Sequence, residues 1–411
     1  MRWEERESYF QTHTFFMELG ELFEAYYECR RNKRGTANAL AFELDYESSL
    51  LKLYEEVQDG TYCVGKSIAF IVDKPVKREI FAGDFRDRII HHYIIRKLNP
   101  TFEKLFIHDS YSCREWKGTL FGIRRIDRFI RQATANHTKD AYILKLDIQG
   151  FFMSIDRNLL LSQILHIIDG KYQWDDKGEL FRLCEKVIGN DPTKNCTIKG
   201  KRENWAGLPK SKSLFFSAPG VGLPIGNLTS QIFANLYLHE LDLFVKKNLK
   251  IRYYGRYVDD FVLIHEDPEY LKEAIVSIRT FLSECLKLEL HPKKIHFHHA
   301  SKGVAFLGAY IKPYRIYVGK RTKGSFFETI EEINRMICWN TGILRDAKIQ
   351  KLFLSSINSY LGLMRHYDSF TIRKKLLFSL HASFWNHFYI SEQYRLVVAK
   401  TRECPRELHI L

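Results

Sequence analysis

The sequence predicts an α+β fold in which helical regions at both ends of the chain flank a central region of mixed helices and strands. Its 411 residues are 45% hydrophobic and 14% aromatic, which is enough apolar material for two or three packed subdomains and too much for a disordered chain. Helical and two-residue periodicities follow one another between about residues 60 and 318. From about residue 328 the periodicity is helical, without a strong strand signal.

The net charge indicates a polyanionic partner. Lys and Arg number 63 against 49 Asp and Glu, a formal charge of +14, so nucleic acid is the leading partner and an acidic membrane surface the competing one. No segment approaches the run of about 18 apolar residues that a membrane helix needs, and the first residues are too charged for a secretory signal. The eight cysteines are scattered singly, which is typical of reduced thiols. We therefore expect a soluble, cytoplasmic protein.

The N-terminal residues 4–58 carry helical periodicity, with one apolar face around Phe15 and Phe16. Residues 30–34 hold four cations. These cations are either the solvated end of a helix or an RNA contact, and the sequence leaves both alternatives open.

The central region alternates between strand and helix patterns. Residues 60–85 carry β-branched and aromatic residues at a two-residue period, which predicts a hairpin with its turn at Asp73-Lys74-Pro75. A polar stretch rich in Gly, Pro and Lys, from about residue 170 to 222, is predicted to be an elaborated insertion and not a second domain. The other predicted elements are a helical region 84–132, a strand 141–148, a helix 228–247, two strands within 251–264, a helix 268–288 and strands within 295–318.

Three carboxylates lie on predicted strands or beside a turn. Asp147 ends a strand in which Lys145 and Asp147 share one face, and Asp259-Asp260 lies between two apolar strand-like runs. An isolated Asp pair is commonly found simply because Asp favours turns. Here aromatic residues flank the pair, and adjacent negative charges repel each other unless a cation lies between them. Carboxylates select hard divalent ions, and two such ions stabilise the attacking and leaving oxygens of a phosphoryl displacement.

Two motifs resemble those of reverse transcriptases. Tyr257-Val258-Asp259-Asp260 resembles their YxDD box, and Leu146-Asp147-Ile148-Gln149-Gly150-Phe151-Phe152 resembles their first catalytic Asp motif, and Asp147 and Asp259 are 112 positions apart. Further matches lie between about residues 60 and 370. The resemblance implies a right-hand polymerase with an N-terminal helical extension (1–60), fingers (61–140), a palm with an antiparallel sheet and the YxDD hairpin (141–318, insertion about 170–221) and a helical thumb (319–411).

The same resemblance implies a site for two metal ions. Asp147 and Asp259 would bind two Mg²⁺ ions, for which Mn²⁺ is a substitute, with the carbonyl of Ile148 as a further ligand and Asp260 as a less directly bound partner. The ions would activate the primer 3′-hydroxyl and neutralise the pyrophosphate leaving group. Lys294, in a segment similar to a palm motif that ends in lysine, would be a general acid, and a solvated lysine is the alternative.

The resemblance also implies nucleotide-binding residues. Lys74 and Arg78 lie in a segment similar to the fingers hairpin and would grip the triphosphate. Phe152 lies where the family has an aromatic gate against the ribose 2′-hydroxyl, although it is one of 30 Phe residues and a core role is the alternative. The motif beside the incoming nucleotide contributes Ile225, Gly226 and Gln231.

Other residues are implied to contact primer and template. Phe306-Leu307-Gly308 resembles the primer grip, a turn in which glycine allows close approach to the primer backbone. Residues 312–323 hold five cations and no acid, and this stripe, which includes Lys312 and Arg315, would follow phosphates. Arg114 would contact template or phosphate, with an internal ion pair as an equal alternative. Tyr257 of the YxDD box is assigned to the primer and template as well.

One motif departs from the common family pattern. Most reverse transcriptases carry Gln-Gly at the positions of Ile225-Gly226 and end the motif in Ser-Pro, whereas the form found here, which ends in Ser230-Gln231, resembles the enzymes of diversity-generating retroelements from bacteria and phages. Replacing a hydrogen-bonding Gln by Ile removes a polar contact that fixes the nucleotide, which predicts low fidelity. The resemblance then implies error-prone cDNA synthesis at template adenines from a template-repeat RNA. Its partners would be a primer, dNTPs and a small basic accessory variability protein that forms an oligomer.

Several alternatives remain. A defence-associated enzyme of the abortive-infection kind would need no template, and a group II intron-like enzyme would be expected to carry Gln-Gly at residues 225–226. A non-catalytic RNA-binding scaffold is disfavoured, because carboxylates without metal ions weaken binding to a polyanion.

Overall fold

The N-terminal part of the chain is helical, as its periodicity predicts. The computed structural model describes residues 17–31, 35–74 and 76–400, so Phe15, Phe16 and the cations at positions 33 and 34 lie outside the described residues. The helices here are α2 (Leu19–Arg30), α3 (Ala37–Glu43) and α4 (Tyr46–Gln58). Nε of Arg30 lies 2.6 Å from Oε1 of Glu43, so this cation has a partner within the fold.

The predicted hairpin between residues 60 and 85 is confirmed. β1 (Ser67–Val72) and β2 (Arg78–Ala82) pair antiparallel, with Val72 opposite Arg78. β4 (Cys196–Ile198) pairs with the other edge of β1 in parallel. The segment that was predicted to be an insertion therefore completes the sheet of the hairpin.

This inserted segment is more regular than its composition predicts. It contains α9 (Lys177–Gly189), whose side chains Leu180, Phe181 and Leu183 are buried. Turn-forming residues on both sides of α9 obscure its helical apolar spacing. Three short 3-10 helices follow, namely η1 (Arg202–Trp205), η2 (Lys210–Lys212) and η3 (Leu214–Phe216).

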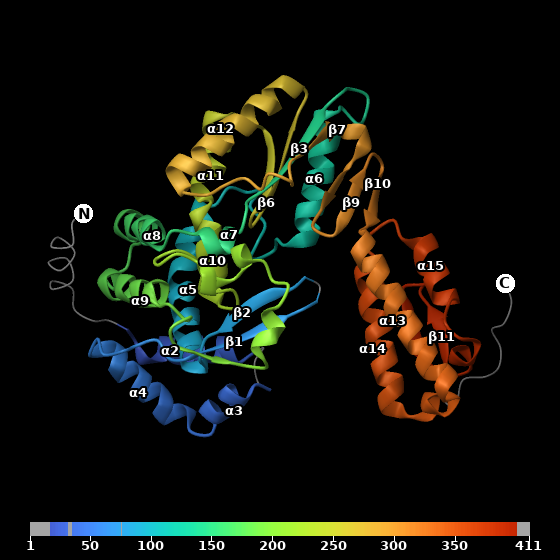
Figure 1. Ribbon diagram of the computed structural model, residues 1–411, viewed down its shortest axis with the longest axis horizontal. Coiled ribbons are helices and arrows are strands. Elements are labelled where there is room, and N and C mark those ends of the chain that lie inside the picture. The colour runs from blue at the N-terminus through green and yellow to red at the C-terminus, as the bar shows by residue number, and fades with distance from the viewer. Residues whose placement is uncertain (1–16, 32–34, 75, 401–411) are drawn as a thin grey trace. The chain divides into compact units, whose positions relative to one another are not determined.

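The central sheet contains the strands that carry the three carboxylates (Figure 1). Its order is β5 (Tyr253–Tyr257), β6 (Asp260–His265), β3 (Tyr142–Asp147) and β7 (His296–His299). The helices of the region are α5 (Phe85–Leu105), α6 (Thr119–Ala133), α7 (Phe151–Ser154), α8 (Arg157–Lys171), α10 (Leu228–Tyr237), α11 (His239–Leu243), the π-helix Phe244–Asn248 and α12 (Pro268–Leu286). α5 packs against α2, α9 and α10 through a buried, largely apolar face.

The C-terminal part begins with a small antiparallel sheet of β8 (Val304–Phe306), β9 (Ala309–Lys312) and β10 (Arg315–Val318). The helices that follow are α13 (Lys320–Trp339), α14 (Ala347–Met364) and α15 (Phe370–Phe378). The short 3-10 helices of this part are η5 (Ala300–Lys302), η6 (Thr341–Arg345) and η7 (Ala382–Asn386).

The end of the chain is not entirely helical, which corrects the expectation from sequence. β11 (Phe388–Ser391) and β12 (Leu396–Ala399) form an antiparallel hairpin. Asn358 of α14 holds it, because its Nδ2 donates to the carbonyl of Val397 and its Oδ1 accepts from the N–H of Val397, each at 2.8 Å. A contact between residues so distant in sequence leaves no local pattern.

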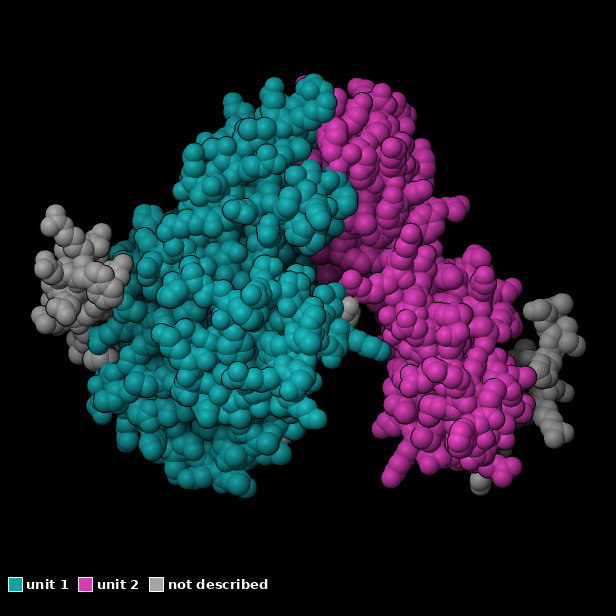
Figure 2. All heavy atoms as spheres, viewed as in Figure 1, with its two compact units in different colours: residues 1–118, 145–263, 269–296 teal, residues 119–144, 264–268, 297–411 magenta. Residues whose placement is uncertain are grey.

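The chain divides into two compact units, which Figure 2 distinguishes by colour. Unit 1 comprises residues 1–118, 145–263 and 269–296, and unit 2 comprises residues 119–144, 264–268 and 297–411. Unit 2 has its own core, in which Phe326, Ile357 and Phe384 are fully buried. Within the described ranges, no helix combines the length and apolarity needed to cross a membrane. The boundaries assigned to fingers, palm and thumb stay predictions.

Candidate active site

The carboxylates singled out in the sequence meet where β3 ends beside the β5–β6 hairpin. Asp147 is the last residue of β3. The next residue, Ile148, donates its N–H to the carbonyl of Asp259 at 3.3 Å, and the carbonyl of Asp147 accepts the N–H of His291 at 2.8 Å. Backbone contacts on both sides therefore fix the end of β3 next to the hairpin turn.

The hairpin turn contains only Val258 and Asp259, between Tyr257 at the end of β5 and Asp260 at the start of β6. The φ angle of Val258 is 56°. This left-handed conformation is rare for a β-branched residue and costs about 1–3 kcal/mol. Such strain persists only where neighbouring contacts fix the backbone, so the position of Asp259 is set by its surroundings.

Burial and mutual repulsion raise the pKa values of Asp259 and Asp260. Burial, followed by the charge of Asp147, raises the pKa of Asp259 to about 6. Burial also raises the pKa of Asp260 to about 6, although Lys145, with Nζ 3.0 Å from Asp260 Oδ2, favours the ionised form and opposes the rise. The protein alone therefore does not fully compensate the negative charge gathered here.

Lys294 lies against the first carboxylate. Its Nζ is 2.8 Å and 3.0 Å from the two carboxylate oxygens of Asp147, and its side chain is 46% exposed. The lysine side chain is flexible and partly in solvent, so this ion pair does not fix it rigidly. Its role as a general acid stays a prediction.

The three carboxylates are chemically suited to a hard divalent ion, which prefers oxygen ligands. Oδ1 of Asp260 is buried and has no hydrogen-bond partner among the described residues. The raised pKa of Asp259 also indicates negative charge that a cation would neutralise. In the described part of the chain no three His, Cys, Asp or Glu side chains are arranged to hold a metal ion, and lysines pair with Asp147 and Asp260. The two-ion site, with Ile148 as a backbone ligand, stays a prediction.

The β1–β2 hairpin carries exposed cations, and one of them, Arg78, acts on Asp259. Lys74 and Arg78 are both exposed. The charge of Arg78 favours the ionised form of Asp259 and so opposes the rise of its pKa, which is the long-range attraction expected of a cation that faces the site. Lys77, between them, donates to the carbonyl of Ala206 at 2.7 Å and so joins the hairpin to the inserted segment.

Ile225 and Gly226 lie against strand β2. The carbonyl of Ile225 accepts the N–H of Phe81 at 2.8 Å. Gly226 has a φ angle of 128°, and a Cβ at this position would lie 2.9 Å from Cγ2 of Ile80, so glycine is required for this approach. The side chains of Ile225 and Phe152 are both half-buried against one apolar cluster of Ala69, Phe81, Met153 and Leu214.

The structure also explains how Phe152 is held. It belongs to the short helix α7, and its carbonyl accepts the N–H of Leu223 at 2.7 Å. The two segments implied to border the nucleotide, 151–154 and 222–226, are therefore directly bonded to each other. Whether Phe152 acts as a gate stays a prediction, since its ring also packs 5.5 Å from that of Phe151.

Sequence reasoning missed the role of Glu79. This side chain is 1% exposed and accepts three hydrogen bonds, from Trp205 Nε1 (2.7 Å), Ser213 Oγ (2.7 Å) and Leu214 N (2.6 Å). It therefore ties β2 to the inserted segment. The only local signal was a carboxylate within a predicted strand, between Arg78 and Ile80. This signal does not identify the hydrogen-bond donors, because Trp205 and Ser213 lie more than 120 residues away in the sequence.

Arg114 has internal partners. Its Nε donates to Glu103 Oε2 at 2.9 Å and its Nη1 to the carbonyls of Ile107 (2.6 Å) and Ser110 (3.0 Å). Only 5% of the side chain is exposed. These contacts favour the internal ion pair over a template contact. Gln231 is exposed, and its Oε1 accepts from Cys113 Sγ at 3.4 Å.

The residues of the implied primer grip and of the cation stripe lie in unit 2. Phe306 ends β8 and is buried, and Leu307 and Gly308 form a two-residue turn with φ angles of 49° and 83°. Positive φ at both positions is the type I′ arrangement that matches strand twist. Lys312 and Arg315 are exposed and lie opposite each other on β9 and β10. Tyr257, in unit 1, is half-buried beside the turn.

Comparison with known proteins adds an independent finding. The family described as "Reverse transcriptase (RNA-dependent DNA polymerase)" matches residues 77–311. Protein YkfC of Escherichia coli (strain K12) is 25% identical over 256 residues, covering 54% of this chain and 60% of YkfC. Group II intron-encoded protein LtrA of Lactococcus lactis subsp. cremoris is 24% identical over 345 residues, covering 67% of this chain and 52% of LtrA. This chain therefore spans between about half and three-fifths of the length of these relatives.

Solved structures of similar fold include two telomerases. Apo telomerase from Candida tropicalis has 14% identity and a TM-score of 0.47, with 77% of this chain and 59% of that chain covered. Telomerase from Candida albicans, in complex with the TWJ fragment of telomeric RNA, has 13% identity and a TM-score of 0.43, with 82% and 60% covered.

Proposed function

The chain belongs to the reverse transcriptase (RNA-dependent DNA polymerase) family, with the right-hand polymerase fold, and on this premise we propose that it copies RNA into DNA with low fidelity for a diversity-generating retroelement. The observation that carries the retroelement assignment is Ile225 at a position where most of the family has glutamine. The alternative within the same family is a group II intron-like enzyme.

Asp147, Asp259 and Asp260 support the polymerase activity. Asp147 and Asp259 would hold divalent ions, most simply Mg²⁺, which supply positive charge at the primer 3′-hydroxyl and the pyrophosphate. Lys145 stabilises the ionised form of Asp260 from 3.0 Å. Lys294 is in contact with Asp147 and carries the proton that a general acid would donate to the leaving group.

Ile225 supports the low fidelity. Its carbonyl accepts the N–H of Phe81 in β2, and its apolar side chain packs in the cluster beside Phe152. The residue therefore offers no polar side-chain group to the nucleotide. Selection of the correct nucleotide depends on how much more tightly the transition state is bound with the correct nucleotide than with a wrong one. Isoleucine cannot form the hydrogen bond that a glutamine side chain would add to this difference. Ile225 therefore fixes the local backbone without discriminating between bases.

The test is cDNA synthesis by the purified protein with Mg²⁺ and dNTPs on a defined RNA template and primer, followed by sequencing. We expect misincorporation concentrated at template adenines, reduced in Ile225→Gln. Ile225→Val is the matched control, because it keeps an apolar β-branched side chain and should keep the error rate. Accurate copying by the wild-type protein would refute the retroelement assignment, and synthesis that ignores the template would indicate the defence class instead.

A group II intron-like function is the second candidate, because the similarity to LtrA extends over 67% of this chain. It predicts accurate copying and little effect of Ile225→Gln. The retroelement assignment instead predicts binding to a template-repeat RNA and to a small basic accessory variability protein. Both candidates require a polyanion-binding surface, for which the formal charge of +14 is suited.

A further inference from the structure

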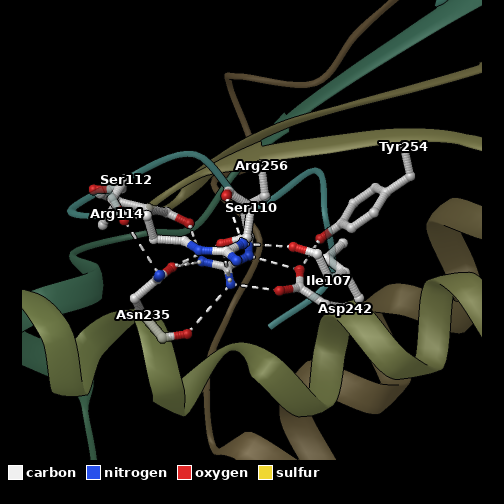
Figure 3. A network of polar contacts seen from close by, with 9 residues as sticks. Ile107, Ser110, Ser112, Arg114, Asn235, Asp242, Tyr254 and Arg256 are labelled. Atoms are coloured by element: carbon white, nitrogen blue, oxygen red, sulfur yellow. Dashed lines mark hydrogen bonds and ion pairs between the residues drawn. The ribbon is translucent and has the colours of Figure 1, made fainter. Parts of the chain in front are cut away.

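A buried arginine, Arg256, directly precedes the YxDD box and lies at the centre of a network of polar contacts (Figure 3). Arg256 and Asp242 are both 0% exposed. Nε and Nη2 of Arg256 lie 2.7 Å and 2.5 Å from the two oxygens of Asp242, which also accepts a hydrogen bond from the hydroxyl of Tyr254 at 2.6 Å. A buried pair of this kind contributes little net stability compared with an apolar pair, because both charges are removed from water. Its role is therefore to be sought in what else the guanidinium binds.

The guanidinium reaches the turn itself. Nη1 of Arg256 donates to the carbonyl of Val258 at 3.1 Å and to Oδ1 of Asn235 at 2.9 Å. Val258 is the residue with the strained φ angle of 56°, and the next residue is Asp259. The hydrogen bond fixes the orientation of the peptide between Val258 and Asp259, and therefore the direction in which the Asp259 side chain leaves the backbone.

The same arginine joins the turn to three other segments. Nη2 also donates to the carbonyl of Asn235 in α10 at 3.2 Å and to Oγ of Ser110 at 3.4 Å, and Asp242 belongs to α11. The backbone N–H of Arg256 donates to Asp109 and its carbonyl accepts from Tyr111, each at 2.9 Å. All five N–H groups of the planar fork are thus used, in directions that a single lysine ammonium does not reproduce.

We propose that Arg256 is a positioning residue for the polymerase reaction. It acts through the carbonyl of Val258: it holds the strained turn in the conformation that directs Asp259 toward the metal ions. The inference rests on the proposed function, because the reaction that needs this geometry is nucleotidyl transfer. It goes beyond that function in assigning the geometry to a residue that touches neither nucleotide nor metal ion.

The test compares Arg256→Lys with a matched control, Arg373→Lys. Arg373 is also a buried arginine (5% exposed) that donates to a backbone carbonyl, that of Tyr394 at 2.7 Å, but it lies in unit 2. Four quantities are measured for each full-length protein: kcat and KM for dNTP on an RNA template and primer, the thermal midpoint, and the affinity for Mn²⁺ by electron paramagnetic resonance. A double variant, Asp242→Leu with Arg256→Met, removes the buried pair without leaving an uncompensated charge.

We expect Arg256→Lys to lower kcat about 10- to 100-fold and to weaken Mn²⁺ binding about 10-fold, while KM for dNTP changes less than about threefold. Arg373→Lys should keep kcat within about twofold even if its thermal midpoint falls equally. The double variant should regain the thermal midpoint and keep the low kcat. Recovery of kcat together with stability in the double variant, or unchanged Mn²⁺ affinity in Arg256→Lys, would show that Arg256 is structural only. If the wild-type protein makes no DNA on any template, the proposed function fails, and the Mn²⁺ comparison still decides the role of Arg256.

Discussion

Glu79 is predicted to determine how firmly the β1–β2 hairpin is held, and Glu79→Gln tests this with almost no change in side-chain shape. In the wild-type protein the carboxylate accepts hydrogen bonds from Trp205 and Ser213 on one oxygen and from the N–H of Leu214 on the other. Glutamine replaces one of these oxygens by an NH₂ group, which then faces at least one donor. The charge assistance is lost at the remaining bonds.

The magnitude follows from these contacts. Hydrogen bonds to a charged group contribute about 1.5–3 kcal/mol each, and neutral ones about 1 kcal/mol. Weakening two bonds and losing the third in a site that is 1% exposed should lower the free energy of unfolding by about 2–4 kcal/mol. Because β2 begins with Arg78, the KM for dNTP should rise as well.

Urea unfolding followed by circular dichroism measures the first effect, and primer extension at varied dNTP concentration measures the second. The control is Glu273→Gln on the exposed face of α12, which should change the free energy of unfolding by less than about 0.5 kcal/mol. A Glu79→Gln protein as stable as the wild type would refute the assignment of these three bonds as a connection between β2 and the inserted segment.

Three further predictions concern the carboxylates, Lys145 and Gly226. The pKa values of Asp259 and Asp260 are raised above their unfolded values to about 6, so the ionised forms are disfavoured on folding. In the metal-free protein, protonation of Asp259 and Asp260 should make the thermal midpoint rise as pH falls from about 7 toward 4. Polymerase activity should fall over the same range, because protonated carboxyls bind cations poorly. Lys145→Met should move the acid limb of the pH–rate profile to higher pH, because the cation that lowers the pKa of Asp260 is lost, whereas Lys145→Arg keeps the charge and should not move it. Equal profiles for the wild type, Lys145→Met and Lys145→Arg would contradict this effect of Lys145 on Asp260. Gly226→Ala should lower the free energy of unfolding by about 1–3 kcal/mol, because the new Cβ would lie 2.9 Å from Ile80 Cγ2 in β2 and φ is 128°. The control is Gly324→Ala, in an open position of α13, which should be neutral or slightly stabilising. The same change in stability at both sites would refute the idea that Gly226 is needed for the close approach to β2.

The elements that sequence reasoning predicts well are those set by local periodicity. The hairpin of β1 and β2, the strand that ends in Asp147 and the hairpin around Asp259 all have alternating or continuous apolar runs, and their register follows once one face is buried. The grouping of Asp147 with Asp259 is predictable because one carboxylate ends a strand, the other lies in a hairpin turn, and together they suit the same divalent ions. Lys145 was within reach of the same reasoning, since it shares a strand face with Asp147.

What the sequence does not reveal depends on contacts between distant segments. Asn358 fixes the β11–β12 hairpin by two hydrogen bonds to Val397, and Glu79 binds donors in the inserted segment. Arg256 was visible as a cation beside the YxDD box, but a strand pattern does not state whether such a side chain is exposed or enclosed by α10 and α11. Each of these polar groups is satisfied only when the tertiary structure is complete, so no window of sequence carries its signature.

The central claim is that Asp259 serves RNA-directed DNA synthesis and not the binding of RNA. Its most direct test is primer extension on an RNA template by wild-type protein and by Asp259→Asn, with the RNA affinity of both proteins measured in the same buffer. For this role of Asp259 we expect that Asp259→Asn makes no detectable DNA and binds RNA as tightly as the wild type or more tightly, because a negative charge facing a polyanion has been removed. DNA synthesis that survives this substitution, or a parallel loss of RNA affinity and synthesis, would contradict it.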